Sequence, residues 1–149
     1  MATFLTQHFT LEEMLESQTA ARFRFDEQFA PPVTVIENLV ALCENVLVPL
    51  RESTNATVLI SSGYRCPRVN AKVGGALKSQ HLIGQAADIF STKFEVEELF
   101  RFIRNGSLPF DQVIQEFGRW VHVSFGPENR RQPLRAIKLG NGRTKYLPG

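Results

Sequence analysis

The chain has 149 residues, of which 43% are hydrophobic and 21% charged, and its formal net charge is +2. A chain of this length and composition forms about one globular domain, which argues against a disordered protein. The small net charge gives no support for a nucleic-acid partner. Two cysteines, Cys43 and Cys66, are too few for a disulfide framework and form no Cys-x-x-Cys pair, so we assign them no role.

The N-terminal sequence MATFLTQHFTLEEM lacks the basic segment and following apolar stretch that mark a signal peptide. We also find no run of about 18 apolar residues, the length needed to span a membrane. We therefore expect a protein that is made in the cytoplasm and is not stably inserted in a membrane.

Helical patterns dominate the first half of the chain. A capping box at Thr10–Glu13 predicts a short helix, and the pair Pro31-Pro32 opens a long one. The long helix carries apolar residues at helical spacing: Val35, Ile36, Leu39, Val40, Cys43, Val46, Leu47 and Leu50. A short strand at Thr57–Ser61 should follow, and then one or two helical turns that stop at Gly74-Gly75.

Strand patterns are more frequent in the second half. AADIF predicts a strand, a second capping box at Thr92–Glu95 begins an amphipathic helix to about Arg104, and DQVIQEF and RWVHVSF predict two strands around a turn near Gly118. From Gly126 onward we expect loop with one further strand, RAIKL. No repeat is present, so the sequence predicts a single α+β domain over residues 1–149.

Two polar residues stand out against the strand pattern. In WVHVSF, His122 lies on the face opposite to the valines, and in AADIF the carboxylate of Asp88 is flanked by small or apolar neighbours. A carboxylate in such a place needs a cation, hydrogen-bond donors or open water. With His81 just upstream, two histidines and one carboxylate would suffice as ligands for catalytic zinc. The spacing leaves open that both histidines are ordinary loop or half-buried residues.

The segment SQHLIGQAAD, residues 79–88, resembles the Ser-x-His-x-x-Gly-x-Ala-x-Asp signature of the zinc D-alanyl-D-alanine carboxypeptidase family, which includes phage endolysins, and matches it at all five specified positions. SGYRCPRVNAKVGGALKSQH and WVHVSF are similar to the family's stretches around the first and last ligands. FTLEEMLES, VLVPLRE and DQVIQEF resemble its small single-domain subgroup, common in phages and prophages. The resemblance covers roughly residues 9–125.

The resemblance implies that His81, Asp88 and His122 bind Zn²⁺, which would activate a water molecule and polarise the scissile carbonyl. Arg65, in SGYR, matches the family arginine that contacts the substrate carboxylate or the developing oxyanion, a role that suits its permanent charge. The alternative is that Arg65 only pairs with a nearby acid. The implied fold is a small antiparallel sheet that carries the metal site and packs against helices, as in D-alanyl-D-alanine carboxypeptidases and hedgehog-like domains.

The general base is where the sequence departs from the family pattern. Relatives commonly place an acid or a histidine two or three residues before the last ligand, but this chain has Arg119 and Trp120 there. Glu116 is the nearest carboxylate, and a tight hairpin would bring it across from the start of the His122 strand. Asp111 is a weaker candidate, since it also suits a turn. Trp120 would line the substrate groove or pack in the core.

Ser79 is a candidate for a substrate or ligand-shell hydrogen bond, and a plain turn role is the alternative for it. Taken together, the resemblance implies a zinc peptidase that cuts a D-amino-acid-containing bond in peptidoglycan stem peptides, as a carboxypeptidase or an endopeptidase. Such a phage or prophage enzyme would reach the cell wall after holin-dependent release or as part of a virion. Two alternatives remain: a non-catalytic zinc-stabilised domain that binds peptidoglycan or a protein, and a peptidase with a cytoplasmic substrate. Zinc is the expected ion, although these ligands also accept other divalent metals.

Overall fold

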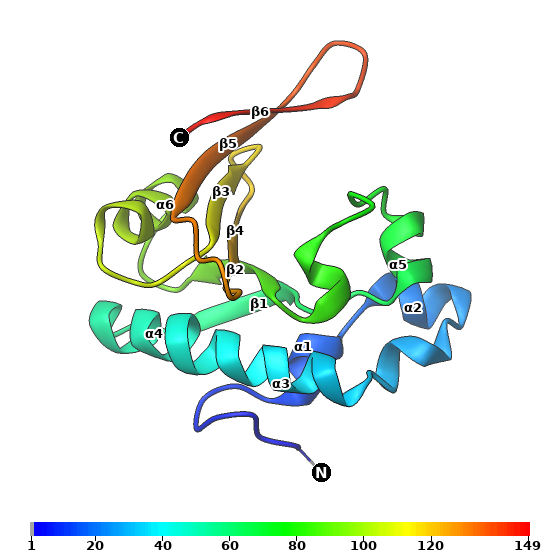
Figure 1. The fold of residues 1–149 in the computed structure, drawn as a ribbon. Coiled ribbons are helices and arrows are strands. Elements are labelled where there is room, and N and C mark those ends of the chain that lie inside the picture. The colour runs from blue at the N-terminus through cyan, green and yellow to red at the C-terminus, as the bar shows by residue number, and fades with distance from the viewer. Residues whose placement is uncertain (1) are drawn as a thin grey trace.

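A six-stranded sheet forms the centre of the molecule, which we describe over residues 2–149 from a computed structural model (Figure 1). The strand order is β1-β2-β4-β3-β5-β6. The strands are β1 (Val58–Ser62), β2 (Ala86–Ser91), β3 (Gln112–Glu116), β4 (Trp120–Ser124), β5 (Gln132–Lys138) and β6 (Thr144–Pro148). The α+β class is confirmed, but the sheet is mixed rather than antiparallel, because β3 and β5 run parallel.

Helices pack against one face of this sheet. The α-helices are α1 (Leu11–Leu15), α2 (Gln18–Phe23), α3 (Val33–Leu42), α4 (Val48–Thr54), α5 (Pro67–Lys72) and α6 (Val96–Asn105), with 3-10 turns at η1 (Asp26–Phe29) and η3 (Gln80–Ile83) and a π-helical turn at η2 (Cys43–Leu47). Their apolar side chains share one core with the strand residues Ile89, Val113, Val121 and Val123. Because side chains alternate along a strand, the opposite face carries Asp88 and His122.

The segments α3, η2 and α4 follow one another as one helical stretch beneath the sheet (Figure 1). By length and composition alone, this stretch, Val33–Thr54, is long and apolar enough to cross a membrane. Our expectation that no run reaches that length was therefore wrong. In the folded chain its buried side chains belong to the protein core, which is also a common use of so apolar a helix.

The first predicted capping box is confirmed. Glu13 donates its backbone N–H to the Thr10 hydroxyl at 3.2 Å, and Thr10 donates its own N–H to the Glu13 carboxylate at 2.7 Å. The second box was misplaced, since Glu95 and Glu98 cap α6. Thr92 lies in the bend directly after β2, where its hydroxyl accepts a hydrogen bond from Thr57 N–H at 3.1 Å.

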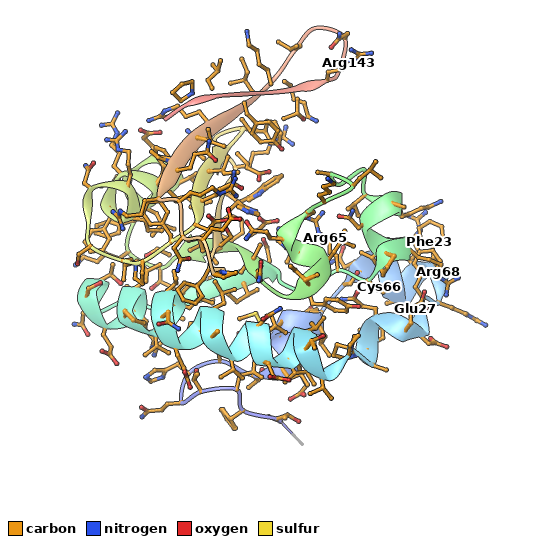
Figure 2. The ribbon with its side chains drawn as sticks, in the orientation of Figure 1. Phe23, Glu27, Arg65, Cys66, Arg68 and Arg143 are labelled. Atoms are coloured by element: carbon orange, nitrogen blue, oxygen red, sulfur yellow. The ribbon has the colours of Figure 1, made fainter. Side chains whose placement is uncertain are left out.

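The C-terminal segment contains two strands, not the single one predicted from RAIKL. β5 and β6 form an antiparallel hairpin whose turn is closed by a 2.8 Å hydrogen bond from Leu139 N–H to Arg143 C=O. Arg143 lies near the tip of this hairpin (Figure 2). The hairpin extends the sheet beyond β3 and adds a wall on the side of the molecule away from the long helix (Figure 1).

Candidate active site

His81 is held by a short turn that packs directly on α3. Ser79 caps η3 by accepting a hydrogen bond from the His81 backbone N–H at 3.2 Å, and it also lines the cleft, so a substrate contact stays a prediction for it. Gly84 ends η3 with φ of +78°, and a Cβ on it would lie 2.6 Å from the Val35 carbonyl oxygen. The motif glycine is thus required both for its left-handed backbone and for this close approach.

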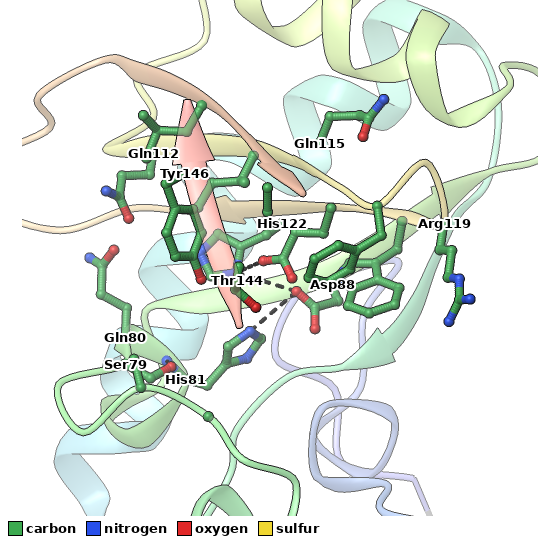
Figure 3. A pocket seen from close by; sticks show the side chains of 18 of the residues that line it. Ser79, Gln80, His81, Asp88, Gln112, Gln115, Arg119, His122, Thr144 and Tyr146 are labelled. Carbon is green, nitrogen blue, oxygen red and sulfur yellow. Dashed lines mark hydrogen bonds and ion pairs between the residues drawn. The ribbon is translucent and has the colours of Figure 1, made fainter. Parts of the chain in front are cut away.

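Asp88 and His122 are direct neighbours on adjacent strands, and η3 brings His81 to them (Figure 3). One carboxylate oxygen, Oδ1 of Asp88, lies 3.2 Å from His81 Nε2 and 3.3 Å from His122 Nδ1. One potential ligand atom from each of the three residues lies within 4.8 Å of the others. The exposed fractions are only 1% for His81, 8% for Asp88 and 7% for His122.

The hydrogen bonds of this group fit a metal. His81 Nδ1 lies 2.6 Å from the carbonyl oxygen of Gly63, which can only accept, so the proton is on Nδ1 and the Nε2 lone pair faces Asp88. Without an ion, a hydrogen bond from Nε2 to Asp88 would require a doubly protonated, buried imidazole. Burial raises the pKa of Asp88, and protonated imidazoles at His81 and His122 would lower it below its ordinary value. A cation held by neutral imidazoles favours the charged carboxylate in the same way. Two imidazole nitrogens and a carboxylate oxygen suit zinc.

Glu116 lies at the edge of this group. The β3–β4 register pairs it with Trp120, and its Oε1 is 3.8 Å from His122 Nδ1. Burial raises the pKa of the Glu116 carboxyl, while the charges of His122 and Arg65 act in the opposite direction. A half-buried carboxylate beside the ligands can accept a proton from water in the site. Trp120 lines the same cleft, where its ring packs edge-on against Phe117 at a centroid distance of 5.7 Å.

Arg65 approaches from the loop between β1 and α5 (Figure 2). Its backbone N–H donates to the His81 carbonyl at 3.0 Å, which ties the two segments together. Its charge acts on both Asp88 and Glu116, so the guanidinium lies within electrostatic range of the metal group. Within residues 2–149, Arg65 Nε is buried and has no hydrogen-bond partner. Among the described residues this nitrogen is therefore not paired with a carboxylate.

Comparison with known families decides the relationship. The family model for Peptidase M15 matches residues 7–124, which is most of the chain and includes Arg65, His81, Asp88, Glu116 and His122. The chain belongs to the Peptidase M15 family. This is the family of zinc D-alanyl-D-alanine carboxypeptidases that the motif indicated, so the resemblance is confirmed. No curated protein matches the chain.

M15 members are zinc-dependent metallopeptidases, and the buried His-Asp-His group in this chain can hold such an ion. A cleft of about 1280 Å³ opens over the group. Its lining includes five basic side chains, Arg65, Lys78, Arg119, Arg130 and Lys138, against two acidic ones, Asp88 and Glu116. Because Asp88 belongs to the metal group and Arg130 pairs with Asp111, four basic side chains remain against Glu116, and the cleft presents a surplus of positive charge to whatever enters it.

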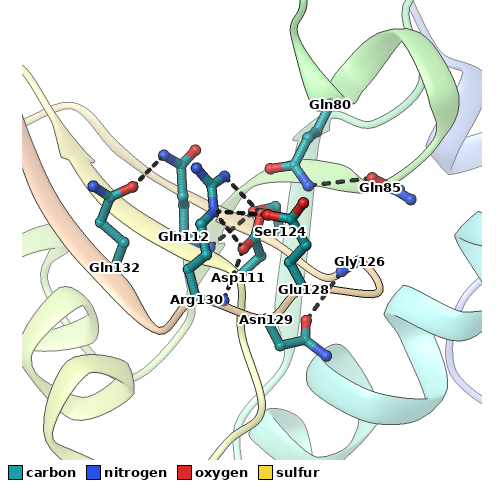
Figure 4. A network of polar contacts seen from close by, with 10 residues as sticks. All are labelled: Gln80, Gln85, Asp111, Gln112, Ser124, Gly126, Glu128, Asn129, Arg130 and Gln132. Carbon is teal, nitrogen blue, oxygen red and sulfur yellow. Dashed lines mark hydrogen bonds and ion pairs between the residues drawn. The ribbon is translucent and has the colours of Figure 1, made fainter.

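Asp111, the weaker candidate for the general base, lies outside the metal group and is paired with Arg130. Its carboxylate accepts hydrogen bonds from Arg130 Nε and Nη2, each at 2.8 Å, and from the Arg130 backbone N–H at 2.9 Å (Figure 4). These contacts lower the pKa of Asp111 to about 2. A carboxylate engaged so fully is a poor proton acceptor, and its contacts join the start of β3 to the loop before β5.

One residue that lines the cleft was not predicted from the sequence. Tyr146, on β6, lines the same cleft as Asp88 and His122 (Figure 3), although the M15 match ends at residue 124. Burial and the nearby charge of Glu116 raise the pKa of Tyr146 above its ordinary value, so its phenol is protonated at neutral pH. No motif marks this position, and the strand that carries it was not predicted.

Proposed function

We propose that residues 1–149 act as one zinc peptidase domain that hydrolyses a peptide bond involving a D-amino acid in peptidoglycan stem peptides. The observation that carries the proposal is the convergence of His81, Asp88 and His122 within 4.8 Å at the floor of a cleft, in a chain of the M15 family. Glu116 and Arg65 stand beside that group.

Each residue of the site has a separate role in the proposed hydrolysis. Zinc, when bound by His81, Asp88 and His122, supplies Lewis-acid activation of water and of the scissile carbonyl. Glu116 accepts the proton of the attacking water as the new C–O bond forms, and then delivers it to the leaving amine nitrogen as the C–N bond breaks. Arg65 pairs with the carbonyl oxygen as its negative charge grows, or with a substrate carboxylate. The products are one carboxylic acid and one amine.

The charge of the cleft supports an acidic peptide as substrate. Stem peptides carry free carboxylates, and the cleft has basic side chains on both sides of the metal group: Lys78 in the loop before η3, and Lys138 at the end of β5. Opposite charges steer such a peptide into the cleft and restrict its register. A cytoplasmic protein substrate would not require a surplus of basic side chains in the cleft.

We further propose that the protein acts on the cell wall after holin-dependent release from a phage- or prophage-infected cell, or as part of a virion. The similarity of FTLEEMLES, VLVPLRE and DQVIQEF to the small phage and prophage subgroup supports this origin. Co-expression with and without a holin in a bacterial host tests it. Lysis that is independent of the holin would contradict the release route.

A non-catalytic zinc-stabilised binding domain is the second candidate, and one observation favours it. The positions two and three residues before His122 hold Trp120 and Arg119, which cannot act as bases at neutral pH. The base must therefore come from β3, across the hairpin. If Glu116 does not move protons, the same cleft would bind a stem peptide without cutting it.

Mass spectrometry of purified muropeptides separates the two candidates. The zinc-loaded protein is incubated with them beside a chelated sample and the His122→Ala variant. We expect a mass loss with the zinc-loaded parent alone, and the size of the released fragment distinguishes a carboxypeptidase from an endopeptidase. No mass loss from a parent that holds one zinc ion per chain would reject the peptidase in favour of the binding domain.

A further inference from the structure

The C-terminal hairpin brings a tyrosine to the metal group from the opposite edge of the sheet. The register pairs Trp120 with Glu116, Glu116 with Ala136, and Ala136 with Tyr146. Directly paired residues on neighbouring strands point to the same face of a sheet, so these four side chains form one row. Tyr146 is thus on the face that carries Asp88 and His122, as Figure 3 shows.

Ala136 leaves room for the tyrosine ring. It is the smallest side chain of the row and is buried, although it lies between the half-buried Glu116 and the exposed Tyr146. A ring that stands on β6 can lean across this methyl group toward β3. Consistent with that direction, the charges of Glu116, Arg65 and Asp88 all act on the phenol of Tyr146.

The hairpin holds Tyr146 in place from the other face. Arg135, the neighbour of Ala136, points away from the cleft and forms a bidentate pair with Glu97 of α6 at 2.7 and 2.9 Å. Gly149 N–H donates to the Pro133 carbonyl at 3.0 Å, which fixes the end of β6 on β5. Tyr146 itself is 52% exposed, so core packing does not explain a tyrosine at this position.

We propose that Tyr146 contacts the substrate, and that its phenol donates a hydrogen bond to the oxygen of the scissile carbonyl as that oxygen gains negative charge. This inference rests on the proposed peptidase function. Arg65 enters the cleft from the β1 edge of the sheet and Tyr146 from the β6 edge, so the two donors approach the reacting group from opposite sides. A donor aimed at developing charge stabilises the transition state more than the bound substrate.

The Tyr146→Phe variant tests the hydroxyl alone, and Tyr64→Phe is its matched control. Tyr64 is the other tyrosine of the chain, is buried, and does not line the cleft. We expect Tyr146→Phe to lower kcat by about 10- to 100-fold with little change in KM. Binding of a phosphinate analogue of the cleaved bond, measured by calorimetry, should weaken by a similar factor. Zinc content should stay at the parent value, and Tyr64→Phe should match the parent in all three measurements.

The outcomes separate this inference from the proposed function. If the parent cleaves muropeptides and Tyr146→Phe has the same kcat and phosphinate affinity, the role of Tyr146 is wrong and the peptidase stands. A higher KM with unchanged kcat would also overturn it, because it would place the hydroxyl in ground-state binding. If the parent itself cleaves nothing, the peptidase proposal fails and this inference fails with it.

Discussion

Replacing Gly75 with alanine should displace Arg65 from the cleft. A Cβ on Gly75 would lie 2.1 Å from Asn70 Oδ1, 2.8 Å from Asn70 Cγ and 3.1 Å from Arg65 Nη1. The first two separations are shorter than real Cβ contacts, so the Asn70 amide has to move, and Arg65 is next to it. Gly75 does not have a positive φ, so the whole effect of the substitution is steric.

The size of the effect follows from what Asn70 does. Asn70 is 4% exposed, and its Nδ2 donates to the Ala76 carbonyl at 2.9 Å. Loss of that buried hydrogen bond costs about 1–3 kcal/mol, and overpacking costs about as much. We expect the free energy of unfolding to fall by roughly 2–6 kcal/mol. The displaced Arg65 should reduce kcat/KM by about 10- to 100-fold, because misplacement by about 1 Å has costs of that order.

Gly74→Ala is the matched control, because Gly74 has φ of +74° and a Cβ there would meet no atom within 4 Å. Backbone strain alone should cost about 1–2 kcal/mol and leave Arg65 in place. The assays are urea unfolding and muropeptide hydrolysis with both variants. Equal activities of Gly74→Ala and Gly75→Ala would refute the steric argument, since only the second variant crowds Arg65.

Three further predictions concern the ligands and the carboxylates. Glu116→Gln should lower kcat by about 10²- to 10⁴-fold while zinc content stays at one ion per chain, and an undiminished rate would exclude Glu116 as the base. Zinc at about 1,000 times its Kd should stabilise the parent by about 4 kcal/mol. In scanning calorimetry it should leave the Tm of Asp88→Asn unchanged, and an equal rise in Tm for both proteins would place the ion elsewhere. The pKa of Asp111 is about 2 in the folded protein and about 3.9 in an unfolded chain. The contacts with Arg130 therefore stabilise the fold by about 2 kcal/mol. This stabilisation is complete above about pH 4 and is lost as the pH falls through about 2. Urea unfolding at pH 5 and pH 2.5 should show this loss in the parent and not in Asp111→Asn, and the same pH dependence in both proteins would contradict it.

Local signals in the sequence predicted the elements that carry them. The reciprocal hydrogen bonds of Thr10 and Glu13 depend on four consecutive residues, so the pattern determines the structure there. The Thr92–Glu95 pattern has the same residue types but fails, because Thr92 bonds to Thr57 of the neighbouring chain segment instead. The parallel pairing of β3 with β5 was unpredictable for the same reason: it is a long-range contact with no local sequence signal.

In the candidate site, too, local sequence signals were predictive and long-range contacts were not. The strand period placed Asp88 and His122 on faces that the structure brings together, and the spacing of DQVIQEF and RWVHVSF placed Glu116 across the hairpin from Trp120. Tyr146 was missed because it reaches the cleft only through two strand pairings, from β3 to β5 and from β5 to β6. A residue placed by pairings of that kind cannot be found by reading along the chain.

The hairpin of β5 and β6 forms a wall of the cleft from a part of the chain that lies apart from the metal ligands. The metal group and Glu116 lie within residues 81–122, whereas the wall that holds Tyr146 comes from residues 132–148. Libraries that vary hairpin positions other than Tyr146 can therefore alter the wall of the cleft while the metal ligands, Glu116 and Tyr146 are kept. Natural variation has the same freedom, since changes in this one strand pair can reshape the cleft without a change in the ligand set.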